Sequence, residues 1–358
     1  MSSLAPHGPP SRARAGVGAV ITAIGVRELG LAAIMVVISI IAALAVPAFH
    51  SAENIGEVLN DAAIYVILAI GETLVLLTRQ IDLSVGATLG LASFVTGEAL
   101  AHASGLGPVG AIVLAVLIGA LMGLGNGLLV DLARMPAIIA TLATLSIYSG
   151  LQVIVSGGAQ IDRSQLPSWL AQLFEVTWLG IPSFIVIALV CVALFTVILR
   201  LTRWGRDLYA MGSHPEAARY MGIPTRRRTY EAFIVCGGLA GFGGLLYAAQ
   251  FGGVDATAGA GFNLTVIAGA VVGGVSLFGG AGSALGAALG SLLLVEIGDI
   301  LALLKISIFA QQTLQGVAIV GAVAVYAVLA RRLQRPAARA QYLETDEQGS
   351  AGSGAVAS

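Results

Sequence analysis

The sequence predicts an all-α integral membrane protein: a polytopic bundle of about ten transmembrane helices with one short cytoplasmic helix. Of the 358 residues, 57% are hydrophobic and only 10% are charged, and the mean hydropathy is +0.93. A water-soluble domain needs far more charge to cover its surface. Apolar runs near the length that crosses a roughly 30 Å hydrocarbon layer recur from Leu29 to Ala330, so helical spans are expected.

The chain divides into a membrane domain and two tails. Residues 1–28 form an N-terminal tail; the apolar segment after it is too long for a signal peptide, so a retained first helix is expected. Residues 331–358 are small, polar and low in complexity, which predicts a disordered tail. Between the tails, residues 29–330 contain the predicted spans 29–49, 60–77, 83–101, 109–130, 137–155, 181–199, 230–250, 263–280, 283–302 and 309–330.

The spans differ in how clearly the sequence marks them. No charged residue occurs between Ala256 and Val295, and glycines are dense from Gly273 to Gly290. Either of the spans predicted there could therefore be short, broken or re-entrant. The 47 glycines of the chain suit transmembrane helices that pack backbone to backbone.

The positive charges predict the orientation of the bundle. With both termini in the cytoplasm, all but two of the 18 Lys and Arg residues fall on the cytoplasmic side; the exceptions are Arg163 and Lys305. Positive charges near span ends stay on the cytoplasmic side. The distribution predicts an even number of spans and a cytoplasmic loop at about 202–228, which holds six arginines.

This loop carries the signals of a short helix. Ser213 and Glu216 have the S-x-x-E spacing of a capping box, in which each side chain accepts from the other's backbone amide. Pro215 suits a first helical turn, and Gly222 before Pro224 suits a helix end. A helix of about two turns is expected at 213–221. It would be marginal alone in water, so something must pack on it. A plain solvated loop whose arginines only set topology is the alternative.

The stretch "GRDLYAMGSHPEAARYMGI" at 205–223 resembles the cytoplasmic EAA loop of ATP-binding-cassette (ABC) importer permeases. It is most similar to the ribose-type, monosaccharide branch of the branched-chain amino acid and sugar permease superfamily. In that family the short helix fits a cleft of the ATPase subunit and transmits its opening and closing. The resemblance implies an ATPase-coupling role for this loop, which we assign to Gly205, Arg206, Ser213, Pro215, Glu216, Ala217, Ala218, Arg219, Gly222 and Ile223.

The resemblance extends from about Ile64 to Ala330. "IDLSVGATLG" at 81–90, "MPAIIATLATLSIYSGL" at 135–151 and "VVGGVSLFGGAGSALGAALGSLLL" at 271–294 are similar to further family segments in the same order. Asn263 and Thr265 stand where the family pattern has an acidic pair, and Ser213-His214 precede Pro215 where Gly-Asn is more usual. These departures leave the substrate subgroup open.

Polar residues within the spans are candidates for a solute pathway, because burying a charged group there costs at least ~2.5 kcal/mol. Glu72 is expected to lie deepest, and Asn126 is a neutral candidate. Helix capping or hydrogen bonding between helices is the competing explanation for each. The candidate pathway residues are Glu72, Asp82, Ser84, Asn126 and Asn263.

The remaining motifs argue against chemistry within this chain. The four histidines lack the spacing of a metal site, and the phosphate-binding G-x-x-x-x-G-K-[ST] loop is not present, since the single lysine, Lys305, is followed by Ile306. We expect no metal and no cofactor bound by this chain, with ATP and Mg²⁺ used by a partner ATPase. The net charge of −1 gives no nucleic-acid footprint.

The leading functional hypothesis is a permease subunit of an ATP-driven importer in the inner membrane of a prokaryote. The resemblance implies three partners in addition to membrane lipid: an ABC ATPase, a second identical or different permease copy, and an extracytoplasmic solute-binding protein. The expected solute is a monosaccharide or a similar small polar molecule; a permease for branched-chain amino acids or another non-sugar solute is the runner-up. A stand-alone secondary transporter or channel is the alternative of another class. An enzyme would need a catalytic constellation that the sequence does not present.

Overall fold

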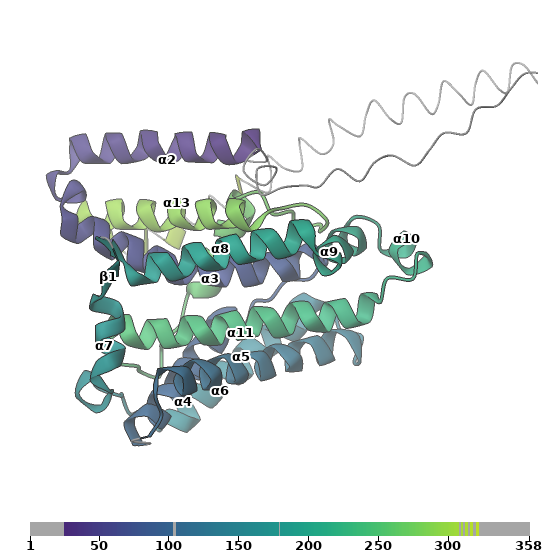
Figure 1. Ribbon diagram of the computed structural model, residues 1–358, viewed down its shortest axis with the longest axis horizontal. Coiled ribbons are helices and arrows are strands. Elements are labelled where there is room, and N and C mark those ends of the chain that lie inside the picture. The colour runs from purple at the N-terminus through teal and green to yellow at the C-terminus, as the bar shows by residue number, and fades with distance from the viewer. Residues whose placement is uncertain are drawn as a thin grey trace, which may run out of the picture.

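The computed structural model describes residues 25–102, 105–178 and 180–307, together with 309–310, 312–313, 316–317 and 320–321. Most of the predicted span 309–330, and the predicted tails apart from 25–28, lie outside the described residues. Within them, long helices run side by side (Figure 1). Seven described helices are long and apolar enough to cross a membrane: α2 (Val26–Ala45), α3 (Ala52–Leu77), α5 (Pro108–Asp131), α6 (Ala137–Ser156), α8 (Ser183–Leu201), α11 (Thr225–Phe251) and α13 (Ala284–Leu303).

Two further predicted spans are helices that fall outside this group of seven. The span predicted at 83–101 is α4 (Val85–His102), an 18-residue helix that is buried over most of its length. The full-length span predicted at 263–280 is wrong. Its helix, α12 (Phe262–Val272), has only 11 residues and is followed by Gly273. Of the alternatives that the dense glycines left open, a short helix is therefore the one observed. A helix of this length spans only about half of the hydrocarbon layer.

Glycines bring α5 and α11 into backbone contact. A Cβ atom added to Gly119 of α5 would lie 2.0 Å from the carbonyl oxygen of Gly237 on α11, and one added to Gly123 would lie 2.1 Å from that of Phe233. Only helices without side chains at these positions can approach so closely. The expectation of backbone-to-backbone packing is therefore confirmed at this contact.

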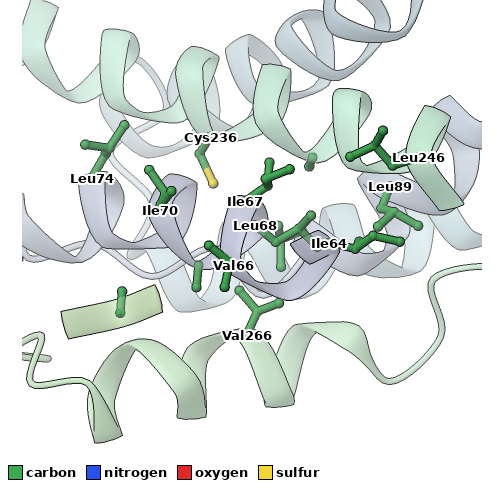
Figure 2. Close-up of a cluster of buried hydrophobic side chains, with 14 of the residues drawn as sticks. Ile64, Val66, Ile67, Leu68, Ile70, Leu74, Leu89, Cys236, Leu246 and Val266 are labelled. Atoms are coloured by element: carbon green, nitrogen blue, oxygen red, sulfur yellow. The ribbon is translucent and has the colours of Figure 1, made fainter. Parts of the chain in front are cut away.

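The core is centred on α3, whose long buried stretch faces neighbours on all sides. Figure 2 shows Ile64, Ile67, Ile70 and Leu74 of α3 packed beneath α11, where Cys236 projects into the same cluster. Both cysteines are free thiols and Cys236 is buried, as expected for small hydrophobes in spans. By contrast, α2, α5, α6 and α8 expose many large apolar side chains, which suits lipid or another membrane chain.

The two ends of the bundle carry different short elements (Figure 1). At one end lie α9 (Arg203–Ser213) and α10 (Pro215–Tyr220). At the other lie α7 (Ser168–Glu175) and an antiparallel pair of two-residue strands, β1 (Thr177–Trp178) and β2 (Ile181–Pro182). Two 3-10 turns complete the described elements, η1 (Pro47–His50) and η2 (Arg163–Gln165). The predicted short helix is therefore displayed at one end of the bundle.

Candidate functional site

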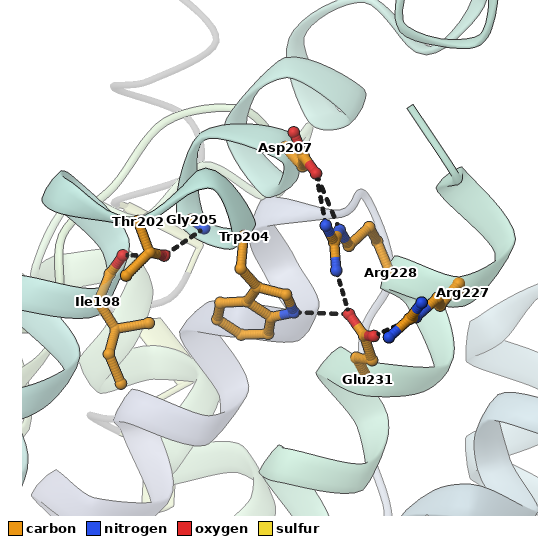
Figure 3. Close-up of polar contacts among 8 residues, drawn as sticks. All are labelled: Ile198, Thr202, Trp204, Gly205, Asp207, Arg227, Arg228 and Glu231. Atoms are coloured by element: carbon orange, nitrogen blue, oxygen red, sulfur yellow. Dashed lines mark hydrogen bonds and ion pairs between the residues drawn. The ribbon is translucent and has the colours of Figure 1, made fainter. Parts of the chain in front are cut away.

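The predicted coupling loop folds as two helices with a break at His214. Thr202 precedes α9, where its hydroxyl accepts from the Gly205 amide at 3.1 Å and donates to the Ile198 carbonyl at 2.7 Å (Figure 3). Arg206 lies in the first turns of this helix and donates to the Leu201 carbonyl at 3.2 Å. Residues Pro215–Tyr220 then form α10. The predicted short helix exists, although it is shorter than expected.

The predicted capping box is wrong. Ser213 is the last residue of α9, and α10 begins after His214, which makes no side-chain capping bond. The Ser213 hydroxyl instead donates to the Gly280 carbonyl at 3.4 Å. The spacing misled because α9 continues through Ser213, so this side chain is positioned by the preceding helix. Glu216 lies in the first turn of α10, where a negative charge interacts favourably with the positive end of the helix dipole.

The other two helix signals are correct. Pro215 occupies the first turn of α10, and Gly222 follows its end with a φ of 77°, a conformation that glycine adopts without strain. The amide of Ile223 donates to the Ala218 carbonyl at 3.0 Å, which closes the end of the helix. The loop therefore turns sharply back toward α11.

One side of α10 packs on the protein and the other faces outward. Ala218 is buried, whereas Glu216, Ala217 and Arg219 are exposed. Tyr220 and Met221 are 92% and 82% exposed. Sequence reasoning missed these last two, although a large aromatic residue and a methionine beside each other in a cytoplasmic loop are a signal of an interaction surface.

An ionic network holds α9 against the start of α11 (Figure 3). Arg228 donates to Asp207 at 2.7 Å and to Glu231 at 2.7 Å. Glu231 also accepts from the Trp204 indole at 2.7 Å and from Arg227 at 2.7 Å. The Arg228 and Asp207 side chains are 14% and 10% exposed, so this pair is screened far less than a surface pair. It gives α10 a firmly anchored base.

A second contact fixes α9 to the glycine-rich segment before α13. Burial raises the pKa of the Tyr209 phenol. Its hydroxyl donates to the Gly282 carbonyl at 2.8 Å.

Four of the five candidate pathway residues form one buried hydrogen-bonded group. Asp82 accepts from the amide and hydroxyl of Ser84 at 2.8 and 2.6 Å, and from Asn126 of α5 at 3.0 Å. Asn126 also donates to the Ser84 hydroxyl at 2.8 Å. Glu72 of α3 accepts from the Asp82 backbone amide at 3.1 Å. All four are at most 1% exposed, so we name them the buried polar cluster.

The buried polar cluster links the ends of three helices. It joins α3 through Glu72, the start of α4 through Ser84, and α5 through Asn126. In this conformation the four side chains form hydrogen bonds between helices, which is the explanation that competes with a role in a solute pathway. Asn263 is different: it is half-buried in the first turn of α12, and no hydrogen bond joins it to the cluster in the described part of the chain. A role of the five candidate residues in a solute pathway remains a prediction.

A cationic cavity of about 790 Å³ opens beside α10. Its lining includes Arg79, Arg134, Arg219 and Arg226, and among the residues that the structure describes its one acidic member is Asp131. Arg226 donates to Asp131 at 2.8 Å. Arg134 and Arg219 have no carboxylate partner among the described residues, which leaves the cavity positive and suited to acidic groups.

Comparison with known proteins matches residues 54–325 to the family described as "Branched-chain amino acid transport system / permease component". The "Autoinducer 2 import system permease protein LsrC" of Enterobacter sp. (strain 638) is 38% identical over 310 residues, which cover 86% of this chain and 89% of that protein. The protein of the same name from Klebsiella pneumoniae is 36% identical over 317 residues, covering 88% and 89% of the two chains. No solved structure gives a significant match. The chain is therefore a multi-pass translocation subunit, not an enzyme, and belongs to the branched-chain amino acid transport system permease family of ABC importers.

Proposed function

We propose that the solute this importer permease carries is a small, polar, sugar-like molecule of the autoinducer 2 type. The observation that carries the proposal is the 38% identity over 86% of the chain to a permease of an autoinducer 2 import system. The family description names branched-chain amino acids, but the Enterobacter and Klebsiella relatives, which each cover most of this chain, are named as permeases of an autoinducer 2 import system. A monosaccharide such as ribose is the nearest alternative within the same chemistry.

The solute is tested by uptake into proteoliposomes that contain the permease, its ATPase and its binding protein. Labelled autoinducer 2 should be accumulated when ATP is inside, and unlabelled ribose should compete more effectively than leucine. Accumulation of leucine with no uptake of autoinducer 2 or ribose would contradict the proposal and favour the branched-chain amino acid alternative.

The ATPase subunit is proposed to dock on α10. Support comes from the outward-facing Glu216, Ala217 and Arg219, and from the exposed Tyr220 and Met221. The ionic network of Arg228 supplies the rigid base that a docking element needs. Residues Gly205, Arg206, Gly222 and Ile223 shape the two ends of this loop.

The membrane orientation follows from the same assignment. With α10 in the cytoplasm, α7 lies at the opposite, extracytoplasmic end (Figure 1), where Arg163 of η2 pairs with Glu175 of α7. The last turns of α13, before Lys305, are joined to the start of α3 by the bond between Asn54 and Asp299. A solute-binding protein would meet that end. The exposed apolar faces of α5 and α6 suit a second permease copy or lipid. We place the chain in the inner membrane of a prokaryote with cytoplasmic termini; ATP and Mg²⁺ act in the partner ATPase.

A further inference from the structure

Arg79 joins the segment after α3 to the junction between α9 and α10. Its Nε donates to the Gly212 carbonyl at 2.5 Å, and its Nη2 donates to the Ser213 carbonyl at 2.9 Å. These are the last two carbonyls of α9, which have no partner within the helix. A cation at a helix C-terminus is also favoured by the helix dipole. The guanidinium therefore holds the residues immediately before α10.

Backbone packing reinforces the same junction. The Gly280 amide donates to the Leu77 carbonyl at 3.1 Å, which ties the loop before α13 to the end of α3. A Cβ atom added to Gly212 would lie 1.9 Å from the Leu77 oxygen and 2.4 Å from the Gly280 nitrogen. Three chain segments thus meet with no space between them, and a displacement of one must displace the others.

Arg79 also forms the turn that ends α3. Its φ of 66° lies in the left-handed region, which a side chain with a Cβ atom rarely adopts. Arg134 and Lys305 adopt it after α5 and α13, so at these positions it belongs to the end of a helix. Here the guanidinium is held by α9, and the Arg79 amide donates to the Leu76 carbonyl at 2.9 Å.

Three residues further along the chain, the same segment enters the buried polar cluster. Asp82 bonds to Glu72, Ser84 and Asn126 and so links α3, α4 and α5. The segment 78–84 is therefore attached at one end to the base of α10 and at the other to three membrane helices. The Arg228 network, by contrast, connects α9 only to the first turns of α11.

We propose that Arg79 is the positioning residue through which movement of α10 reaches the transmembrane bundle. The inference rests on the proposed docking of the ATPase on α10. When the ATPase displaces α10, the two hydrogen bonds of Arg79 carry the displacement into segment 78–84, and the buried polar cluster transmits it to α3, α4 and α5. Arg79 therefore acts on the coupling of ATP hydrolysis to transport and not on docking itself.

The test uses the reconstituted complex of permease, ATPase and binding protein, with autoinducer 2 as the solute. Arg79→Ala should keep the ATPase co-purifying and should keep basal ATP hydrolysis. The maximal uptake rate should fall by at least about tenfold, as expected from losing two hydrogen bonds to a charged group. The solute concentration at half-maximal uptake should stay unchanged, so more ATP is hydrolysed per solute imported. Arg79→Lys keeps one cationic donor and should recover part of the rate.

The matched control is Arg226→Ala. Arg226 lines the same cavity, but its side chain pairs with Asp131, and among the described residues no hydrogen bond or ion pair joins it to α9 or α10. This variant should keep the parental ratio of ATP hydrolysed to solute imported.

A second pair of variants tests the junction without removing a charge. Gly212→Ala forces the end of α9 away from Leu77 and Gly280, and it should produce the same excess of ATP hydrolysis over uptake. Gly56→Ala, in α3, meets no atom within 4 Å and should behave like the parent. This pair carries the test if Arg79→Ala does not reach the membrane.

The outcomes separate the inference from the proposed function. Parental uptake in Arg79→Ala and Gly212→Ala would overturn the inference and leave the docking proposal intact. Loss of ATPase co-purification in these variants would also overturn it, because Arg79 would then shape the docking surface and not transmit movement. If the Glu216→Arg variant keeps parental docking and uptake, the proposed docking on α10 fails instead.

Discussion

The side-chain amide of Asn126 on α5 donates to Asp82 in the segment between α3 and α4 at 3.0 Å, with both residues at most 1% exposed. This bond supplies a donor to a carboxylate that no cation approaches within ion-pair distance in the described part of the chain. A buried acceptor that loses its donor costs more than the bond itself contributes, because the desolvation penalty remains.

Replacing Asn126 by Leu should therefore destabilise the folded bundle. The expected loss is about 1–3 kcal/mol, seen as a lower melting temperature of the detergent-solubilised protein. Asn263→Leu is the control, since that amide makes no bond to the buried polar cluster. Equal melting temperatures for the two variants would show that the cluster does not stabilise the bundle.

Replacing Gly119 by alanine should destabilise the contact between α5 and α11. An added Cβ atom would lie 2.0 Å from the Gly237 oxygen, so the helices must separate, at a cost of about 1–3 kcal/mol. Gly238→Ala, on the same contact, meets its nearest atom at 3.5 Å and should be tolerated. Thermal unfolding of both variants checks the difference. A Gly119→Ala variant as stable as the parent would contradict the observed approach.

Two neighbouring arginines should differ in their effect on the base of α10. Arg228→Met removes the cation that Asp207 and Glu231 share, which should cost about 2 kcal/mol because the pair is mostly buried. Arg227→Met removes a pair whose arginine is 76% exposed, worth about 0.5 kcal/mol or less. Limited proteolysis at the α9–α10 loop should be faster only for the Arg228 variant. Equal rates of cleavage of this loop in the two variants would contradict the prediction.

The proposed orientation predicts which end of the bundle a membrane-impermeant thiol reagent reaches. With Cys191 and Cys236 replaced by alanine, a cysteine at Tyr220 should be labelled only after the membrane is opened, and one at Ser168 should be labelled in intact cells. Tyr220 is 92% exposed in this chain, and producing the permease without its ATPase keeps position 220 from being covered by docking. Labelling of position 220 in sealed cells would reverse the orientation.

Much of the fold could be predicted because hydropathy and length constrain helices in lipid so strongly. The predicted span 60–77 omits the first residues of α3, which include Glu53 and Glu57; the helix begins at Ala52, where the Ser51 hydroxyl accepts from the Asn54 amide at 3.2 Å. The short length of α12 could only be anticipated as one of several possibilities, since glycine density does not say which segment is interrupted.

The candidate site was predicted in its parts but not in its contacts. Pro215 and Gly222 act locally, so their roles at the ends of α10 could be read from sequence. The Ser213 capping box failed because spacing cannot tell which of two adjoining helices contains a residue. Arg79 was missed as a coupling residue: its partners are 133 and 134 residues away, and an arginine after an apolar span is ordinarily a topology signal.

Docking of the ATPase on α10 is tested most directly by the charge of Glu216, the exposed carboxylate in the first turn of that helix. Glu216→Arg places a cation at the N-terminus of α10 and one turn before Arg219, which destabilises the helix, and it reverses the charge of the parental side chain. The measurement is ATP-driven uptake in proteoliposomes, with membrane abundance and ATPase co-purification determined on the same preparation. The variant should insert normally, lose most of its bound ATPase and reduce uptake at least about tenfold, the change that accompanies loss of about 1.4 kcal/mol of binding free energy. Parental uptake with a normally inserted Glu216→Arg chain would show that α10 is not where the ATPase drives import.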